Sequence, residues 1–182
     1  MMQFRWSTLI STIFFIGFIP FAPGTFGSLA AFPIYFFTLQ FTSSFLQASE
    51  YLLILAVILT LVGLWAIGKY QEITYNPDHP SVVIDEVIGM LVTLALAFEP
   101  AYQIGEALIV KGYFTEYSQT YHAFAIAFLA FRYFDISKPL LIGLVDRRLK
   151  TPFGVILDDI LAGVFAGGTI IAAHKLMLMY LY

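Results

Sequence analysis

The sequence predicts an all-α fold, a multi-pass membrane helical bundle, on two observations. Of the 182 residues, 60% are hydrophobic and only 12% are charged, whereas about a quarter of the residues in a soluble domain are charged. The apolar stretches also lack the period-two alternation of transmembrane strands. Backbone groups in lipid must be paired within their own segment, so helices are expected. We expect residues 1–182 to form one domain.

Six apolar stretches are the candidate helices. They are Leu9–Ile19, Leu29–Phe41, Leu52–Ile67, Val87–Phe98, Ala123–Phe134 and Val155–Met179. Several are shorter than the roughly 20 residues that a perpendicular span needs. A short stretch is also compatible with a half-helix or a buried core helix. The N-terminal segment is expected to be re-entrant or a half-helix.

The polar or broken connections define a topology. They are Thr42–Glu50, Lys69–Ser81, Glu99–His122 and Ser137–Pro152. Counting the apolar stretches as membrane crossings places Lys69–Ser81, Ser137–Pro152 and Pro20–Ser28 on one side of the membrane. The same count places Glu99–His122 on the other side. The first side carries most of the flanking lysines and arginines, and the positive-inside rule then places it in the cytoplasm.

Carboxylates are concentrated on this cytoplasmic side. Seven of the twelve acidic residues fall in four places there: Asp78; Asp85 and Glu86; Asp135 and Asp146; Asp158 and Asp159. Charges in or beside apolar helices are costly and need partners, and too few basic residues lie nearby. A divalent cation would hold the carboxylates together, and their hard oxygen ligands suit Mg²⁺.

Two of the acidic segments resemble each other. Val83–Gly89 and Ile156–Gly163 each contain two apolar, two acidic and two apolar residues followed by a small one. On a helix the small residue lies one turn from a carboxylate, and small residues allow helices to approach closely. Two such helices could present up to four carboxylates to one metal: Asp85, Glu86, Asp158 and Asp159. The alternative is acids at polar helix N-termini, which the helix dipole favours.

Cations and hydroxyls on the same side are candidates for phosphate binding. Arg132, Asp135 and Lys138 would form one stripe if helical, with Pro139 marking the helix end. The alternative is a surface Arg–Asp pair with an extended lysine. Thr25 and Ser28 precede an apolar helix, where they could cap it beside free N–H groups that bind anions. A simple capped turn is the alternative.

Composition excludes several classes of function. The chain has no cysteine, which removes disulfides, thiolate metal sites and cysteine-nucleophile phosphatase chemistry. The net charge is −3 and no basic run is present, so no nucleic acid partner is expected. His79, beside Asp78, is either a proton carrier or a surface histidine in a turn.

The ordered motifs resemble those of the phosphatidylglycerophosphatase A family over about residues 13–170. They are Ala22–Ser28, Asp78-His79 with Val83–Gly89, Phe131–Pro139, Asp146-Arg147 and Gly154–Gly163. The resemblance implies an all-helical core and Mg²⁺-dependent hydrolysis of phosphatidylglycerophosphate to phosphatidylglycerol and phosphate. It also implies a place in bacterial phospholipid biosynthesis at the inner membrane. Two departures are a longer Glu99–His122 stretch and fewer glycines before Gly154.

Roles can be assigned to the candidate residues. The metal ligands would be Asp85, Glu86, Asp158 and Asp159. The nucleophile would be either water or a carboxylate, and a covalent route would use Asp85 or Asp135. Asp78 or His79 would protonate the leaving oxygen. The groups that bind the substrate phosphate would be Thr25, Ser28, Arg132, Lys138 and Arg147.

Two other functions are alternatives to this one. Intramembrane carboxylates also form ion pathways, so an ion-coupled membrane transporter is the alternative from another class. The chain has few spans for that, and no clear inverted repeat beyond the two acidic segments. A phosphatidyltransferase would also use clustered aspartates, but its spaced aspartate–glycine pattern is absent. The sequence does not indicate an oligomeric state.

Overall fold

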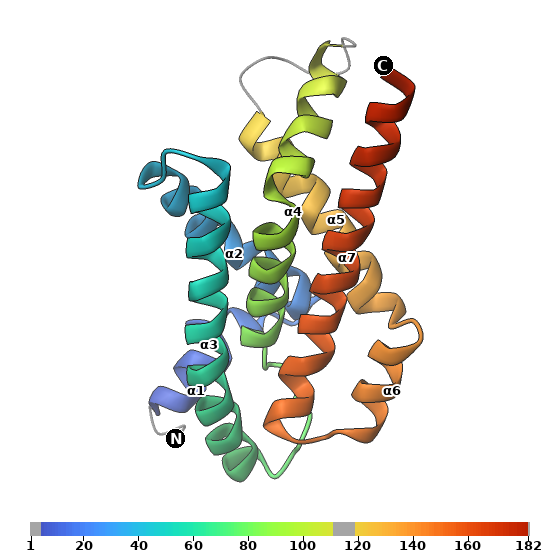
Figure 1. The fold of residues 1–182 in the computed structure, drawn as a ribbon. Coiled ribbons are helices and arrows are strands. Elements are labelled where there is room, and N and C mark those ends of the chain that lie inside the picture. The colour runs from blue at the N-terminus through green and yellow to red at the C-terminus, as the bar shows by residue number, and fades with distance from the viewer. Residues whose placement is uncertain (1–4, 111–118, 182) are drawn as a thin grey trace.

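The protein is a bundle of helices (Figure 1), as the sequence predicts. The computed structural model describes residues 5–110 and 119–181 and contains no strand within them. Its elements are α1 (Trp6–Ser11), a 3-10 helix (Ile16–Phe18), α2 (Pro23–Gln40), α3 (Phe45–Thr74), α4 (Ile84–Val110), α5 (Gln119–Ser137), α6 (Leu141–Arg148) and α7 (Pro152–Leu181). Three helices within these ranges are long and apolar enough to cross a membrane: Phe45–Thr74, Ile84–Ile109 and Pro152–Tyr180.

Helix α4 is the centre of the bundle. Figure 1 shows it between α3 and α7, and it also packs against α2 and α5. Its residues Ile84, Ile88, Leu91 and Leu94 are fully buried. A helix that is apolar on every face is stable when other helices surround it. The two acids in its first turn are therefore held in the interior of the protein.

Helices α4 and α7 approach each other closely at two glycines. A Cβ atom on Gly163 would lie 2.5 Å from the carbonyl oxygen of Gly89, and one on Gly89 would lie 2.6 Å from the carbonyl oxygen of Asp159. Any larger residue would force the backbones apart. The expectation that small residues bring the two acidic segments together is confirmed.

The N-terminal segment is a short helix followed by a reversal, which confirms the expected half-helix. Helix α1 has only six residues, and Ile13, Phe14 and Phe15 have positive φ angles. The backbone N–H of Val83 donates to the carbonyl oxygen of Ser11 at 2.9 Å. This bond fixes α1 beside the start of α4.

Helices extend into all four of the expected connections, and the departure is largest in Glu99–His122 and Ser137–Pro152. Helix α4 continues to Val110 through a kink at Ala97, because Pro100 lacks the N–H that would bond to the preceding turn. Of the Glu99–His122 stretch, residues 111–118 lie outside the described residues. The Ser137–Pro152 stretch contains α6, whose buried Ile142 and Gly143 allow it to pack against α7.

The unusual polar segments meet at one end of the bundle. This end holds the end of α3, the starts of α4 and α7, and α6 (Figure 1, bottom). The start of α2 belongs to it as well, because a Cβ on Gly24 would lie 2.5 Å from Oε1 of Glu86. The topology deduced by counting crossings is consistent with this arrangement.

Cysteine labelling can determine which side this end faces. The chain has no cysteine, so single cysteines can be introduced at Tyr75 and Thr151 near the acidic end and at Glu106 near the other end, all of which are exposed. We expect an impermeant thiol reagent to label Glu106→Cys in intact cells, and to label Tyr75→Cys and Thr151→Cys only after lysis. Labelling of Tyr75→Cys and Thr151→Cys in intact cells would show that the acidic end faces outwards.

Candidate active site

Three carboxylates, two of them buried and one partly buried, form the centre of the site. Asp85 and Glu86 lie in the first turn of α4, and Asp159 lies on the facing part of α7. Each offers an oxygen atom, and these oxygens all lie within 4.8 Å of one another. Ligands on opposite sides of an octahedral Mg²⁺ ion are about 4 Å apart. The spacing therefore suits a metal ion of this size.

Two oxygens of this group are buried without a partner. Asp85 Oδ1 and Glu86 Oε2 have no hydrogen-bond donor within the described part of the chain. Buried polar atoms are normally satisfied, and each exception requires an explanation. A cation between the three carboxylates would satisfy these oxygens and reduce the repulsion between the charges. The residues present thus fit a hard divalent cation.

Asp158, the fourth expected ligand, is engaged differently. Its Oδ2 accepts a hydrogen bond from Lys138 Nζ at 2.7 Å. The same nitrogen donates to Oδ1 of Asp146, also at 2.7 Å. The three-carboxylate group of the structure therefore includes three of the four expected ligands, and Asp158 lies next to it as the partner of a lysine.

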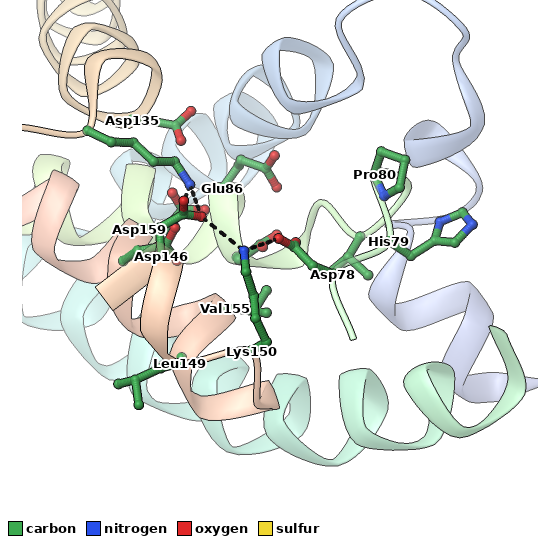
Figure 2. Close-up of a pocket in the computed structure, with 15 residues that line it drawn as sticks. Asp78, His79, Pro80, Glu86, Asp135, Asp146, Leu149, Lys150, Val155 and Asp159 are labelled. Atoms are coloured by element: carbon green, nitrogen blue, oxygen red, sulfur yellow. Dashed lines mark hydrogen bonds and ion pairs between the residues drawn. The ribbon is translucent and has the colours of Figure 1, made fainter. Parts of the chain in front are cut away.

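Asp158 begins an alternating series of charges that we call the lysine–aspartate chain. Its members are Asp158, Lys138, Asp146, Lys150 and Asp78. Lys150 Nζ lies 3.6 Å from Asp146 Oδ1 and 2.5 Å from Asp78 Oδ2. Figure 2 shows Lys150 between the two aspartates. The chain links the buried carboxylates to the Asn76–Ser81 loop, in which Asp78 is exposed.

The ion pairs keep both lysines charged. Burial opposes the charge on Lys138, but its hydrogen bonds to Asp146 and Asp158 outweigh that effect and raise the pKa of the ammonium. The hydrogen bond to Asp78 raises the pKa of Lys150. Burial also opposes the charge on Asp146, yet the bond from Lys138 leaves the pKa of this carboxyl below its ordinary value. Both ammonium groups are thus held in their charged form by the neighbouring aspartates.

A cavity of about 130 Å³ lies at this end of the bundle. All seven acidic residues singled out in the sequence line it, together with Lys138, Lys150 and His79. Seven carboxylates against two ammonium groups leave a formal charge of −5 with His79 neutral. The cavity can therefore attract cations, and it needs them before it can hold an anion.

The predicted polar stripe is confirmed for Arg132 and Asp135, which lie on α5, but not for Lys138. Arg132 Nη1 donates to Asp135 Oδ2 and lies 3.4 Å from Ser28 Oγ. Helix α5 ends at Ser137, and Lys138 has a φ of 42°, outside the helix. This left-handed turn redirects the lysine side chain towards α6 and α7. Arg132 does not line the cavity, but its partner Asp135 does. Arg132 therefore acts on the cavity by holding Asp135 in place.

Thr25, Ser28 and Arg147 are not among the lining residues. Helix α2 already begins at Pro23, so the expected caps lie inside it. The N–H of Thr25 is bonded to the carbonyl oxygen of Ala22, and the hydroxyl of Ser28 donates to the carbonyl oxygen of Gly24 at 2.8 Å. Arg147 lies on the exposed face of α6. The expectation that Thr25 and Ser28 cap a helix was wrong.

His79 and Asp78 both line the cavity. Nδ1 of His79 accepts a hydrogen bond from the backbone N–H of Ser81 at 3.2 Å and lies 2.7 Å from the Ser81 hydroxyl. That hydroxyl also lies 2.7 Å from the hydroxyl of Tyr70. A neutral ring that accepts at Nδ1 carries its proton on Nε2. In Figure 2 the ring points away from Glu86 and Asp159.

Lys150 is the charged lining residue that sequence reasoning missed as part of the site. It stands outside the family-like motifs, in a connection that the sequence assigns to the acidic side. One available signal was that Ser137–Pro152 contains two lysines, Lys138 and Lys150, on a side with seven carboxylates. Their pairing depends on the turn of α6, which the sequence pattern did not reveal.

Comparisons with known proteins agree on one family. The sequence profile of the family described as phosphatidylglycerophosphatase A matches residues 9–174. Proteins named phosphatidylglycerophosphatase A from Haemophilus influenzae and Escherichia coli are 31% and 30% identical to the chain, over 93% and 88% of its length and 90% and 78% of theirs.

A protein of Bacteroides thetaiotaomicron is 34% identical over 87% of both chains, and it is named, provisionally, a phosphatidylinositol-3-phosphatase. No solved structure matches the chain significantly. The profile match and these identities lead to one conclusion: the chain belongs to the phosphatidylglycerophosphatase A family.

Proposed function

We propose that the protein is a Mg²⁺-dependent lipid phosphatase, a phosphoric monoester hydrolase that converts phosphatidylglycerophosphate to phosphatidylglycerol and inorganic phosphate. One observation carries the proposal: a single cavity at the end of a bundle with membrane-spanning helices is lined by a three-carboxylate group and two lysines. The names of the two relatives from Haemophilus influenzae and Escherichia coli support this substrate. The partners would be the bilayer and its phospholipid.

The charge of the cavity supports the metal. A phosphate monoester entering a cavity with a formal charge of −5 would be repelled, and two lysines already paired with aspartates do not offset this. We assign Asp85, Glu86 and Asp159 as the residues that hold Mg²⁺, with Asp158 beside them. The ion would neutralise charge on the phosphoryl oxygens. Oxygen ligands and a site that also takes phosphate suit Mg²⁺.

The chain's own residues would perform the remaining steps. Lys138, beside Asp158, binds the phosphoryl oxygens and stabilises the charge that develops on them. Asp135, which Arg132 holds in place, would either take a proton from an attacking water or attack phosphorus itself. In the second case water then hydrolyses the aspartyl phosphate, which releases phosphate and restores the carboxylate. As phosphorus gains the new oxygen, its bond to the leaving oxygen breaks and that oxygen needs a proton.

Asp78 and His79 remain the candidate proton donors, because both line the cavity. Nε2 of a neutral His79 carries a proton, but the ring would have to turn from Ser81 towards the carboxylates to deliver it. Asp78 is the outer member of the lysine–aspartate chain, where its carboxylate accepts a hydrogen bond from Lys150. Single Asn and Gln variants at these two positions, compared by their pH profiles, would identify the donor.

We place the enzyme in the bacterial cytoplasmic (inner) membrane with the cavity facing the cytoplasm. The lysines and arginines near the acidic end support this orientation. All three relatives are bacterial proteins.

Purified protein should release phosphate from phosphatidylglycerophosphate only in the presence of Mg²⁺. Excess chelator is expected to abolish the activity, because the negative cavity cannot hold the substrate phosphate without the cation, and added Mg²⁺ should restore it. The measurement is phosphate release in mixed micelles. Phosphatidylinositol 3-phosphate is the comparison substrate, since one relative carries that activity in its name.

Full activity in excess chelator would refute the metal proposal. A strong preference for phosphatidylinositol 3-phosphate would refute the substrate but retain the reaction class. A net ion flux in proteoliposomes without phosphate release would favour the transporter alternative.

A further inference from the structure

Lys150 is a charged cavity residue to which the proposed hydrolysis gives no task. Its nitrogen and that of Lys138 contact the same oxygen atom, Asp146 Oδ1, at 3.6 and 2.7 Å. The two ammonium groups therefore cannot be farther apart than the sum of these distances. The cavity presents two neighbouring positive groups, each held by aspartates on both sides.

The two lysines occupy different depths. The partner of Lys138 is Asp158, whose side chain is only 7% exposed and which adjoins the three-carboxylate group. The other partner of Lys150 is Asp78, which is 48% exposed. Lys138 is thus the inner ammonium, next to the proposed reaction centre, and Lys150 is the outer one, at the mouth of the cavity.

The proposed substrate also carries two phosphate groups. One is the terminal monoester that is removed, and the other is the phosphodiester that joins the headgroup glycerol to the lipid. The three carbons of that glycerol separate them. If the headgroup enters with its terminal monoester first, a monoester at the reaction centre leaves the diester farther out in the cavity.

We propose that Lys150 forms a second phosphate subsite, which binds the phosphodiester of a lipid headgroup that carries two phosphates. This inference rests on the proposed function. Lys138 and Lys150 would bind the two phosphates in the order in which the headgroup enters. Lys150 would be a specificity residue, because an ammonium group at that position favours lipids with a diester anion beside the reacting monoester.

A purely structural role for Lys150 makes a different prediction. The Lys150–Asp78 pair ties the Asn76–Ser81 loop to the segment before α7, and exposed ion pairs of this kind add little stability. Loss of the pair would then change thermal stability slightly and affect every ligand alike. Product inhibition separates the two roles, since each product of the reaction carries one of the two phosphates.

The test compares inhibition by dihexanoyl phosphatidylglycerol, which has only the diester, with inhibition by inorganic phosphate. In Lys150→Met we expect the inhibition constant for the phosphatidylglycerol to rise about tenfold, as for the loss of one charge-assisted hydrogen bond, and that for inorganic phosphate to change less than about twofold. Lys150→Arg keeps the charge and should recover most of the inhibition. Lys69→Met, which removes an exposed pair with Glu72 away from the cavity, is the matched control.

Equal changes for the two inhibitors in Lys150→Met, or no change for either, would overturn the inference. So would a Lys150→Arg variant that behaves like Lys150→Met, because the effect would then not depend on charge. A wild-type protein that does not hydrolyse phosphatidylglycerophosphate would refute the proposed function itself, which is a separate and recognisable result.

Discussion

Asp85→Asn and Asp159→Asn are each expected to lower phosphate release by at least about a hundredfold, while the chain still folds and inserts. Asparagine keeps the size of the side chain and caps helices about as well as aspartate, so it removes the charge alone. The oxygens of Asp85, Glu86 and Asp159 lie within 4.8 Å of one another. Removing one carboxylate would weaken the binding of a cation to all three.

The measurement is a Mg²⁺ titration of activity, with membrane insertion checked on the same samples. A ligand role predicts that the variants need more Mg²⁺ for whatever activity remains. Glu50→Gln, an exposed position on α3 at the other end of the bundle, is the control and should behave like wild type. If the Asn variants retain most of their activity at every Mg²⁺ concentration, these acids have a structural role, and the metal site must be sought around Asp78, Asp135 and Asp146.

The long helices could be predicted from the sequence because an apolar segment in lipid must pair its own backbone groups. Without the period-two alternation of a transmembrane strand, a helix is the structure that does so. The sequence did not predict their ends. The apolar stretch Val87–Phe98 suggested that α4 would stop at Phe98, but the helix bends at Ala97 and continues. The polar composition of Ser137–Pro152 concealed α6, a helix of eight residues that is too short for apolar periodicity to be evident.

The site was predictable to the extent that it is built on two similar sequence segments. The paired patterns at Asp85-Glu86 and Asp158-Asp159 reveal two similar segments, and the glycines indicate that these can touch. Which acids share a centre was not predictable, because it depends on how α4 and α7 are rotated. The partner of Asp158 is Lys138, which the chain brings there through a left-handed residue after α5, and no spacing rule anticipates that turn.

The contact between α4 and α7 is the second point at which a single change should have a large effect. A Cβ on Gly163 would lie 2.5 Å from the carbonyl oxygen of Gly89, a backbone atom that cannot move aside by rotating a side chain. Gly163→Val should therefore destabilise the protein by about 1–3 kcal/mol or more. Gly163 lies one turn after Asp159, so helices forced apart here would also separate Asp159 from Asp85 and Glu86.

We expect Gly163→Val to lower the melting temperature in detergent and to lose most of its phosphate release even at temperatures where it remains folded. Gly168→Val is the matched control, since it places the same side chain on the same helix where nothing lies within 4 Å of the added Cβ. The control should retain both stability and activity. A Gly163→Val protein with wild-type melting and activity would show that the close approach of α4 and α7 does not hold the carboxylate centre together.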